Sequence, residues 1–306
     1  MENQNNVTEF VFLGLFMNLD LKMMCFVIFL FYYFEIFLGN FTIFIMITCN
    51  EQPMYFFLSY LAFMDICFTS TVAPKLIVDL LAQRRTISYN NCMAQMFCAH
   101  FFDAIEIFIL VAMAFDCYVA IFKPMHYMVI MSRQVCRLIV LASCIGAFLH
   151  SIMQVLIAVR LPFCGPNKTD HYFCDVFPPL KLACADTFLL LTVLISTNGM
   201  LSILTFISLL ISSIIILATL RTHSSEGRHK ALSTCGSHIT VVIMFFVPLI
   251  FTHVPIGISV NEDKVFALFY TIIAPMFNPF IYSLRNTGKK NAMRKVWLQK
   301  LASKGK

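Results

Sequence analysis

Charged residues are scarce in this chain of 306 residues, because Asp, Glu, Lys and Arg together make up only 12% of it. A typical soluble domain carries roughly 25% charged residues. Hydrophobic residues reach 59%, and the mean hydropathy is +0.81. This leaves too little polar surface to cover a globule in water. Because lipid accepts apolar side chains on the outside of a protein, the composition predicts an integral membrane protein.

The chain also lacks linkers, low-complexity segments, internal repeats and recognisable catalytic motifs. Neither an HExxH metal-binding motif nor a GxSxG nucleophile motif occurs, which argues against a membrane enzyme. A transporter or channel would need polar residues along a continuous path and broken helices near the midplane. The interior charges that stand out are two acids, Asp65 and Glu106. We therefore expect a single domain that is neither an enzyme nor a transporter.

Seven apolar runs are long enough to cross a bilayer, which takes about 20 residues per helix. They lie near 23–48, 54–80, 93–121, 135–159, 189–220, 235–254 and 264–284. The fold class predicted for 1–306 is an all-α membrane protein, a seven-helix bundle. Segment 1–22 precedes the bundle, and 287–306 follows it.

The distribution of Lys and Arg predicts the orientation. These residues are more numerous in and beside the loops on the side that carries 287–306, so we expect a cytoplasmic C-terminus and an extracellular N-terminus in the plasma membrane. The net charge of +6 then indicates contact with anionic lipids rather than with nucleic acid. Segment 1–22 is too hydrophilic for a cleaved signal peptide. Its sequon at Asn6 is a candidate glycosylation site, and a second sequon begins at Asn167.

Four of the twelve cysteines fall on the predicted outer side, where disulfides persist: Cys92, Cys164, Cys174 and Cys184. Four cysteines allow three pairings, and the residues alone do not choose among them. The segment from His171 to Asp175 also contains metal-binding residue types, but a metal site there would need Cys174 as a free thiolate.

Five phrases follow one another at matching depths of the predicted helices. They are Leu-Gly-Asn at 38–40, Pro-Met-Tyr-Phe-Phe-Leu at 53–58, Met-Ala-Phe-Asp-Cys-Tyr-Val-Ala-Ile at 113–121, Lys-Ala-Leu-Ser-Thr-Cys at 230–235 and Pro-Met-Phe-Asn-Pro-Phe-Ile-Tyr at 275–282. Together they resemble the rhodopsin-like G-protein-coupled receptors and, within them, the tetrapod-type olfactory receptors of family 4.

This resemblance implies a receptor that binds a small volatile odorant inside the bundle and raises cAMP through a stimulatory heterotrimeric G protein. It implies disulfides between Cys92 and Cys174 and between Cys164 and Cys184. It also implies a short amphipathic helix at 287–300. The spacing of apolar residues between lysines and arginines in that segment supports such a helix independently.

The resemblance places the odorant pocket in the outer half of the bundle. Helical spacing puts five residues of the third run on one face: Ala99, His100, Asp103, Ala104 and Ile107. Family position adds Val176, Thr197, Asn198, Phe246, Leu249, Ile250, His253 and Thr271. The pocket would be mostly apolar with a few polar anchors, as small-ligand sites usually are.

Asp103 departs from the family, whose members usually carry a small residue such as Gly there. A carboxylate facing an apolar cavity favours a cation. His100 or His253 could supply that charge internally, and an amine odorant could supply it from outside. Two hypotheses therefore stay open: a structural pair of Asp103 with His100, and a preference for polar or basic ligands.

Asp65 and Glu106 face one another in the centre of the bundle according to the resemblance, close to Asn278. Two carboxylates in a low dielectric do not both stay ionised unless a cation lies between them. We expect a Na⁺ ion or a shared proton there; the alternative is two protonated acids bonded to their neighbours. No other cofactor is expected.

The cytoplasmic half departs from the family more sharply. The usual Asp-Arg-Tyr triplet is here Asp116-Cys117-Tyr118, and Ser213 stands where the family's partner tyrosine is expected. Cysteine supplies neither the charge nor the length of arginine. Lys230 and Tyr282 complete the expected G-protein contact region. The alternative to a coupled receptor is therefore a receptor-derived protein with weak or no coupling.

Overall fold

The computed structural model describes residues 8–15, 19–48, 53–160, 167–176, 188–220, 240, 242–252 and 260–277. Five helices in these ranges are long and apolar enough to cross a membrane. They are α1 (Leu19–Thr48), α2 (Pro53–Leu81), α3 (Tyr89–Phe122), α5 (Arg133–Val159) and α7 (Phe188–Leu220). The first five predicted spans are confirmed, although α1 and α3 each begin four residues earlier than the apolar runs indicated.

Two further helical segments overlap the sixth and seventh predicted spans. One covers 242–252. The other starts with α9 (Val260–Leu268) and continues through the π-helical segment η2 (Phe269–Ile273) to residue 277. The other parts of these two spans lie outside the described residues.

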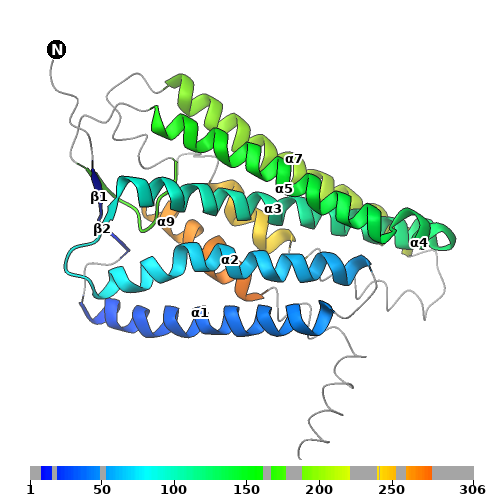
Figure 1. Ribbon diagram of the computed structural model, residues 1–306, viewed down its shortest axis with the longest axis horizontal. Helices are drawn as coiled ribbons and strands as arrows, with labels where there is room; N and C mark the ends of the chain where they lie inside the picture. Colours follow the sequence, from blue (N-terminus) through cyan, green and yellow to red (C-terminus); the bar gives the residue numbers. More distant parts are fainter. Residues whose placement is uncertain are drawn as a thin grey trace, which may run out of the picture.

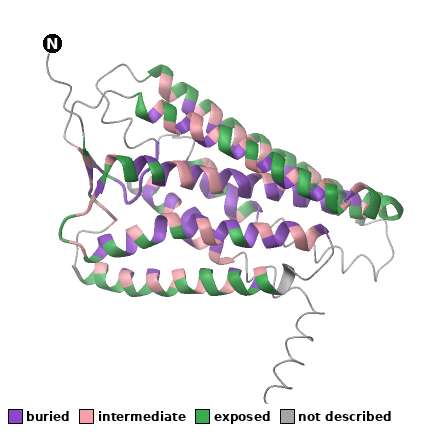
Figure 2. Ribbon diagram, viewed as in Figure 1, coloured by how far each residue is buried: buried purple, intermediate pink, exposed green. Residues whose placement is uncertain are grey.

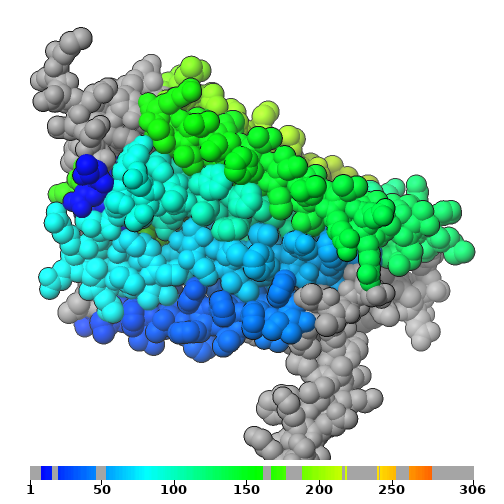
Figure 3. Space-filling view, in the orientation of Figure 1, coloured from blue at the N-terminus to red at the C-terminus, as the bar shows by residue number. Residues whose placement is uncertain are grey.

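Helix α3 lies in the middle of the bundle. It packs against α2, α5 and α7, and α1 packs on the outer side of α2 (Figure 1). Burial follows the same order: α2 and α3 have long buried faces, whereas α1 is largely exposed (Figure 2). The exposed side chains of α1 include Phe31 and Phe34, 62% and 55% accessible, as expected for a surface that contacts lipid. On the face shown in Figure 3, the side chains of neighbouring helices adjoin in continuous bands.

A small sheet closes one end of the bundle, and the apolar pattern did not predict it. It consists of β1 (Glu9–Phe12), β2 (Thr86–Ser88) and β3 (Lys168–Thr169), in the order β2-β1-β3. Strand β1 runs antiparallel to β2 and parallel to β3. Phe10 and Phe12 alternate with less buried neighbours and are 1% and 3% accessible, which is the period of a strand with one buried face.

We call β1, β2, β3 and residues 170–176 the cap. Next to β1 the backbone turns at Gly14 with φ of 77°. Arg85 donates a 2.6 Å hydrogen bond to the carbonyl of Leu13, and a Cβ at Gly14 would lie 2.1 Å from the Arg85 guanidinium. Lys264 of α9 bonds to Asp170 at 2.5 Å. Segments far apart in the sequence are thus tied together over this capped end.

The opposite end of the bundle carries a short connection after α3. Helix α3 ends at Phe122, and Pro124, which cannot donate a backbone hydrogen bond, opens the 3₁₀ turn η1 (Pro124–His126). Helix α4 (Tyr127–Ile130) follows, and Ser132 then caps the start of α5.

Candidate functional site

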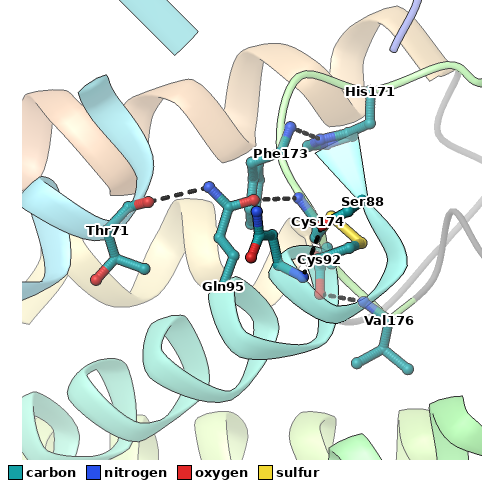
Figure 4. The surroundings of a disulfide bond; sticks show 10 residues. Thr71, Ser88, Cys92, Gln95, His171, Phe173, Cys174 and Val176 are labelled. Carbon is teal, nitrogen blue, oxygen red and sulfur yellow. Dashed lines mark hydrogen bonds between the residues drawn. A yellow bond between two sulfur atoms is a disulfide. The ribbon is translucent and has the colours of Figure 1, made fainter. Parts of the chain in front are cut away.

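The disulfide between Cys92 and Cys174 joins the start of α3 to the cap (Figure 4). The structure thus confirms the pairing of Cys92 with Cys174 that the resemblance implied. Gln95, one turn further along α3, braces the same junction: its amide donates to the carbonyl of Thr71 at 3.0 Å and accepts from the backbone N–H of Cys174 at 3.1 Å. Gln95 was not singled out in the sequence, because a lone amide in an apolar run has no distinctive pattern. Since Cys174 is oxidised, it does not offer the thiolate that a metal site in this segment would need.

Several predicted residues and segments lie outside the described residues. They are Asn6, Cys164, Cys184, Lys230, His253, Asn278, Tyr282 and the helix expected at 287–300. The predictions about them stay predictions.

Residues 171–173 of the cap reach into the bundle. Tyr172 and Phe173 are each 2% accessible, and the hydroxyl of Tyr172 shares a 3.0 Å hydrogen bond with that of Thr271. Thr271 lies in the π-helical segment η2, a type of irregularity that is frequent at functional sites. Burial lowers the pKa of His171 from 6.5 to about 4, and its Nδ1 accepts a hydrogen bond from the N–H of Phe173.

The predicted face of α3 is buried along its whole length: Ala99, His100, Asp103, Ala104 and Ile107 are each at most 8% accessible. His100 directs Nε2 toward Asp175 of the cap, 3.4 Å from its Oδ1. Asp103 lies close enough to both for their charges to act on it. Its Oδ1 is buried and has no hydrogen-bond partner among the described residues. His100 thus pairs with Asp175, and the sequence had not identified Asp175 as its partner.

All the apolar members of the predicted pocket except Val176 share one buried cluster, although they come from separate elements. This cluster brings together residues of α3, of the 242–252 helix, of η2 and of the cap: Ala99, Ala104, Ile107, Phe246, Leu249, Tyr270, Tyr172 and Phe173, with Ile250 packed against it. Val176 lies in a second cluster beside the disulfide, with Met96 of α3 and Leu194 of α7. Thr197 is only partly buried, and its hydroxyl donates to Val193 of its own helix at 2.9 Å.

Asn198 of α7 is 2% accessible and accepts a 2.7 Å hydrogen bond from the side-chain amide of Gln154 on α5. Gln154 is fully buried. It was missed in the sequence for the same reason as Gln95.

Asp65 and Glu106 are 0% and 1% accessible, and their carboxyl groups lie close enough to interact with one another. A bond between two carboxyl groups requires a proton on one of them. Oε1 of Glu106 is buried and has no hydrogen-bond partner among the described residues. The pair therefore has oxygen ligands available for a proton or a small hard cation.

At the opposite end, Asp116 is 2% accessible and accepts a 2.9 Å hydrogen bond from the hydroxyl of Tyr127 on α4. Cys117 is buried, and Tyr118 is half-exposed and stacks on Phe122 with 4.7 Å between the ring centroids. Ser213 is a buried residue of α7. The two ends thus differ in kind. The capped end gathers buried polar groups inside an apolar cluster, whereas the described part of the other end presents an acid, Asp116, held by a connecting helix.

Comparisons with known proteins identify the family to which the chain is similar. Residues 29–300 match the family model described as "Olfactory receptor". The Homo sapiens protein "Olfactory receptor 4S2" is 53% identical over 311 residues, which cover 100% of both chains. "Olfactory receptor 4B1" of Homo sapiens and "Olfactory receptor 4B13" of Mus musculus are each 51% identical over 303 residues, covering 98% of this chain and 98% and 99% of theirs.

These matches extend over nearly the whole chain and confirm the expected seven-helix bundle of a multi-pass membrane protein. They give no support to the alternative of a receptor-derived protein with weak or no G-protein coupling. The chain belongs to the olfactory receptor family and is a G-protein-coupled odorant receptor, not an enzyme.

Proposed function

We propose that this receptor binds its odorant in the capped half of the bundle and that binding raises cAMP through a stimulatory heterotrimeric G protein at the opposite end. The pocket would lie between α3, α7, the 242–252 helix, η2 and the cap. The buried cluster that joins these elements supports this placement. Its few polar groups, among them His100, Asp103 and Asn198, are buried with it.

The proposed orientation puts the cap outside the cell and the Asp116 end in the cytoplasm of a plasma-membrane receptor. The excess of Lys and Arg on the side of 287–306 supports it. The disulfide in the cap supports it too, because disulfides persist in the oxidising exterior and are rare in the cytosol.

The ligand class that the geometry favours is a polar, preferably basic, volatile. The single observation that carries this proposal is Oδ1 of Asp103, which is buried without a hydrogen-bond partner among the described residues while His100 is directed at Asp175. A buried carboxyl oxygen without a partner costs about 1–3 kcal/mol, and more when the group is charged. A protonated amine would supply both a donor and a positive charge. Tyr270, whose ring stacks on that of Phe68 with 6.0 Å between the centroids, lies within range of the Asp103 charge, and its aromatic ring also favours cations.

The test is a cAMP assay with amines and with alkanes of equal chain length. We expect amines to act at lower concentrations on the native receptor, and Asp103→Gly and Asp103→Asn to remove that advantage. The matched control is Asp79→Asn, which changes another buried aspartate that is already bonded to Lys75. If amines gain nothing over alkanes, or if Asp103→Asn leaves their advantage intact, the proposed preference is wrong.

We propose that the carboxyl pair of Asp65 and Glu106 binds Na⁺ or a shared proton. The bound ion or proton would stabilise one conformation of the bundle. The unpartnered Oε1 of Glu106 supports an additional ligand there. Replacing choline by Na⁺ should raise the melting temperature of the purified receptor, and Asp65→Asn should abolish the difference. If the melting temperature is equal in both salts at several pH values, Na⁺ does not bind, and only the shared proton remains as the occupant of this site.

A further inference from the structure

Two buried amides link α5 and α7 in the capped half of the bundle. The Nε2 group of Gln154 donates a 2.7 Å hydrogen bond to Oδ1 of Asn198. Gln154 is 0% accessible and Asn198 is 2% accessible. Each amide group has both donors and an acceptor, so one bond between them leaves capacity unused on both sides.

The unused atoms are one acceptor and one donor. Oε1 of Gln154 and Nδ2 of Asn198 are both buried, and neither has a hydrogen-bond partner among the described residues. Turning both amides over would reverse the bond between them but would again leave one donor and one acceptor. Buried polar atoms are nearly always satisfied, so two unsatisfied atoms on one bonded pair indicate that a further group belongs there.

The neighbouring side chains on α5 and α7, both within the described residues, do not supply that group. One helical turn nearer the cap, Ala158 and Leu194 are both fully buried and belong to the apolar cluster around Val176. About one helical turn in the other direction, α5 carries Ser151 and α7 carries Ser202. Their hydroxyls donate to carbonyls of their own helices, at 2.8 Å and 2.9 Å.

We propose that Gln154 and Asn198 form a subsite for the hydroxyl group of an odorant. This proposal rests on the proposed function, because it assigns part of the same odorant pocket. An alcohol would donate its O–H to Oε1 of Gln154 and accept from Nδ2 of Asn198, which satisfies both atoms at once. An aldehyde or an ester only accepts, and leaves the glutamine oxygen without a partner. A protonated amine only donates, so this subsite is chemically distinct from Asp103.

The experiment measures the melting temperature of the purified, detergent-solubilised receptor with straight-chain alcohols and aldehydes from four to ten carbons, since a ligand that binds the folded state stabilises it. From the concentration dependence we expect alcohols to bind about tenfold more tightly than aldehydes of equal length, the size of effect that an unsatisfied buried group produces. Gln154→Met and Asn198→Leu keep similar side-chain volumes and should each reduce the ratio to about one.

Two control variants separate recognition from folding. Ser202→Ala changes a buried hydroxyl one turn away that is already bonded, and should keep the preference for alcohols. The double variant Gln154→Asn with Asn198→Gln exchanges the two amides. It retains a donor and an acceptor, so it should keep part of the preference for alcohols. A preference that is absent in the native receptor, or that survives in Gln154→Met, overturns the subsite and leaves a buried water as its occupant. Stabilisation by aldehydes and alcohols alike would overturn the hydroxyl subsite but leave the odorant pocket standing. Stabilisation by neither would overturn the subsite, and the amine assay above would then decide whether the pocket stands.

Discussion

The hydroxyl of Tyr127 donates a 2.9 Å hydrogen bond to Oδ1 of Asp116 and so ties the end of α3 to the connecting helix α4. The family's arginine, which would follow Asp116, is Cys117 in this chain. Burial, followed by the Asp116 carboxyl, raises the pKa of Tyr127, so the phenol keeps its proton and remains a donor. In this chain, Tyr127 of the connecting helix therefore forms a hydrogen bond with Asp116, the acid of a triplet that lacks the family's arginine.

Tyr127→Phe removes this bond and leaves the buried carboxyl of Asp116 without it. Such a loss weakens the link between α3 and α4 by about 1–3 kcal/mol. We expect a lower melting temperature and a higher basal cAMP level per receptor at the cell surface. The control is Tyr118→Phe, because Tyr118 is half-exposed and stacks on Phe122. Equal effects of the two variants would contradict a specific role for Tyr127.

Cys117→Arg restores the arginine of the family triplet. Arginine adds a permanent charge and the reach that cysteine lacks. We expect the maximal cAMP response to an active odorant to rise severalfold at equal surface staining. Cys117→Ser, which adds neither charge nor length, should leave the response unchanged. If both variants respond like the native receptor, this position does not limit coupling.

The five long helices were predictable from the sequence because each is a continuous apolar run, and lipid imposes that pattern over the full width of the membrane. Strand β1 was not predictable in the same way. It has four residues, and its partners β2 and β3 are supplied by distant parts of the chain. A two-residue alternation of Phe10 and Phe12 becomes a strand only once the cap assembles around it.

The candidate site shows the same division. The buried face of α3 followed from helical spacing, and the disulfide of Cys92 followed from the resemblance. Gln154 was missed because its importance comes from Asn198, 44 residues further along the chain. The pairing of His100 with Asp175 was missed because a loop brings the aspartate into the bundle. Long-range contacts of this kind leave no periodic pattern.

The cap should lose stability as the pH falls. His171 titrates near 6.5 when unfolded, but burial lowers its pKa to about 4 in the folded cap, where Asp175, Lys264 and Asp170 also act on it. Above pH 6.5 the imidazole is neutral in both states. Between pH 6.5 and 4 only the unfolded state takes up the proton, so stability decreases as the pH is lowered, by up to about 3 kcal/mol.

Melting temperatures of the purified receptor at pH 7 and pH 5 measure this effect. His171→Asn keeps an acceptor for the N–H of Phe173 but does not titrate, so its melting temperature should fall less than that of the native receptor over the same interval. Identical losses in the two proteins would show that His171 does not carry the pH dependence.

The two candidate outer sequons should differ in use. Asn167 is held in the cap, where its Nδ2 donates a 2.7 Å hydrogen bond to the carbonyl of Glu9, and Thr169 of the same sequon is 4% accessible in β3. A glycan on that nitrogen would have to displace β1. We therefore expect the receptor to carry its N-linked glycan at Asn6 alone, which gel mobility before and after treatment with an amide-cleaving glycosidase can establish. Asn6→Gln should remove the shift and Asn167→Gln should preserve it. A shift that depends on Asn167 would contradict the packing of β1 against β3, and the absence of any shift in the native receptor would count against an extracellular N-terminus.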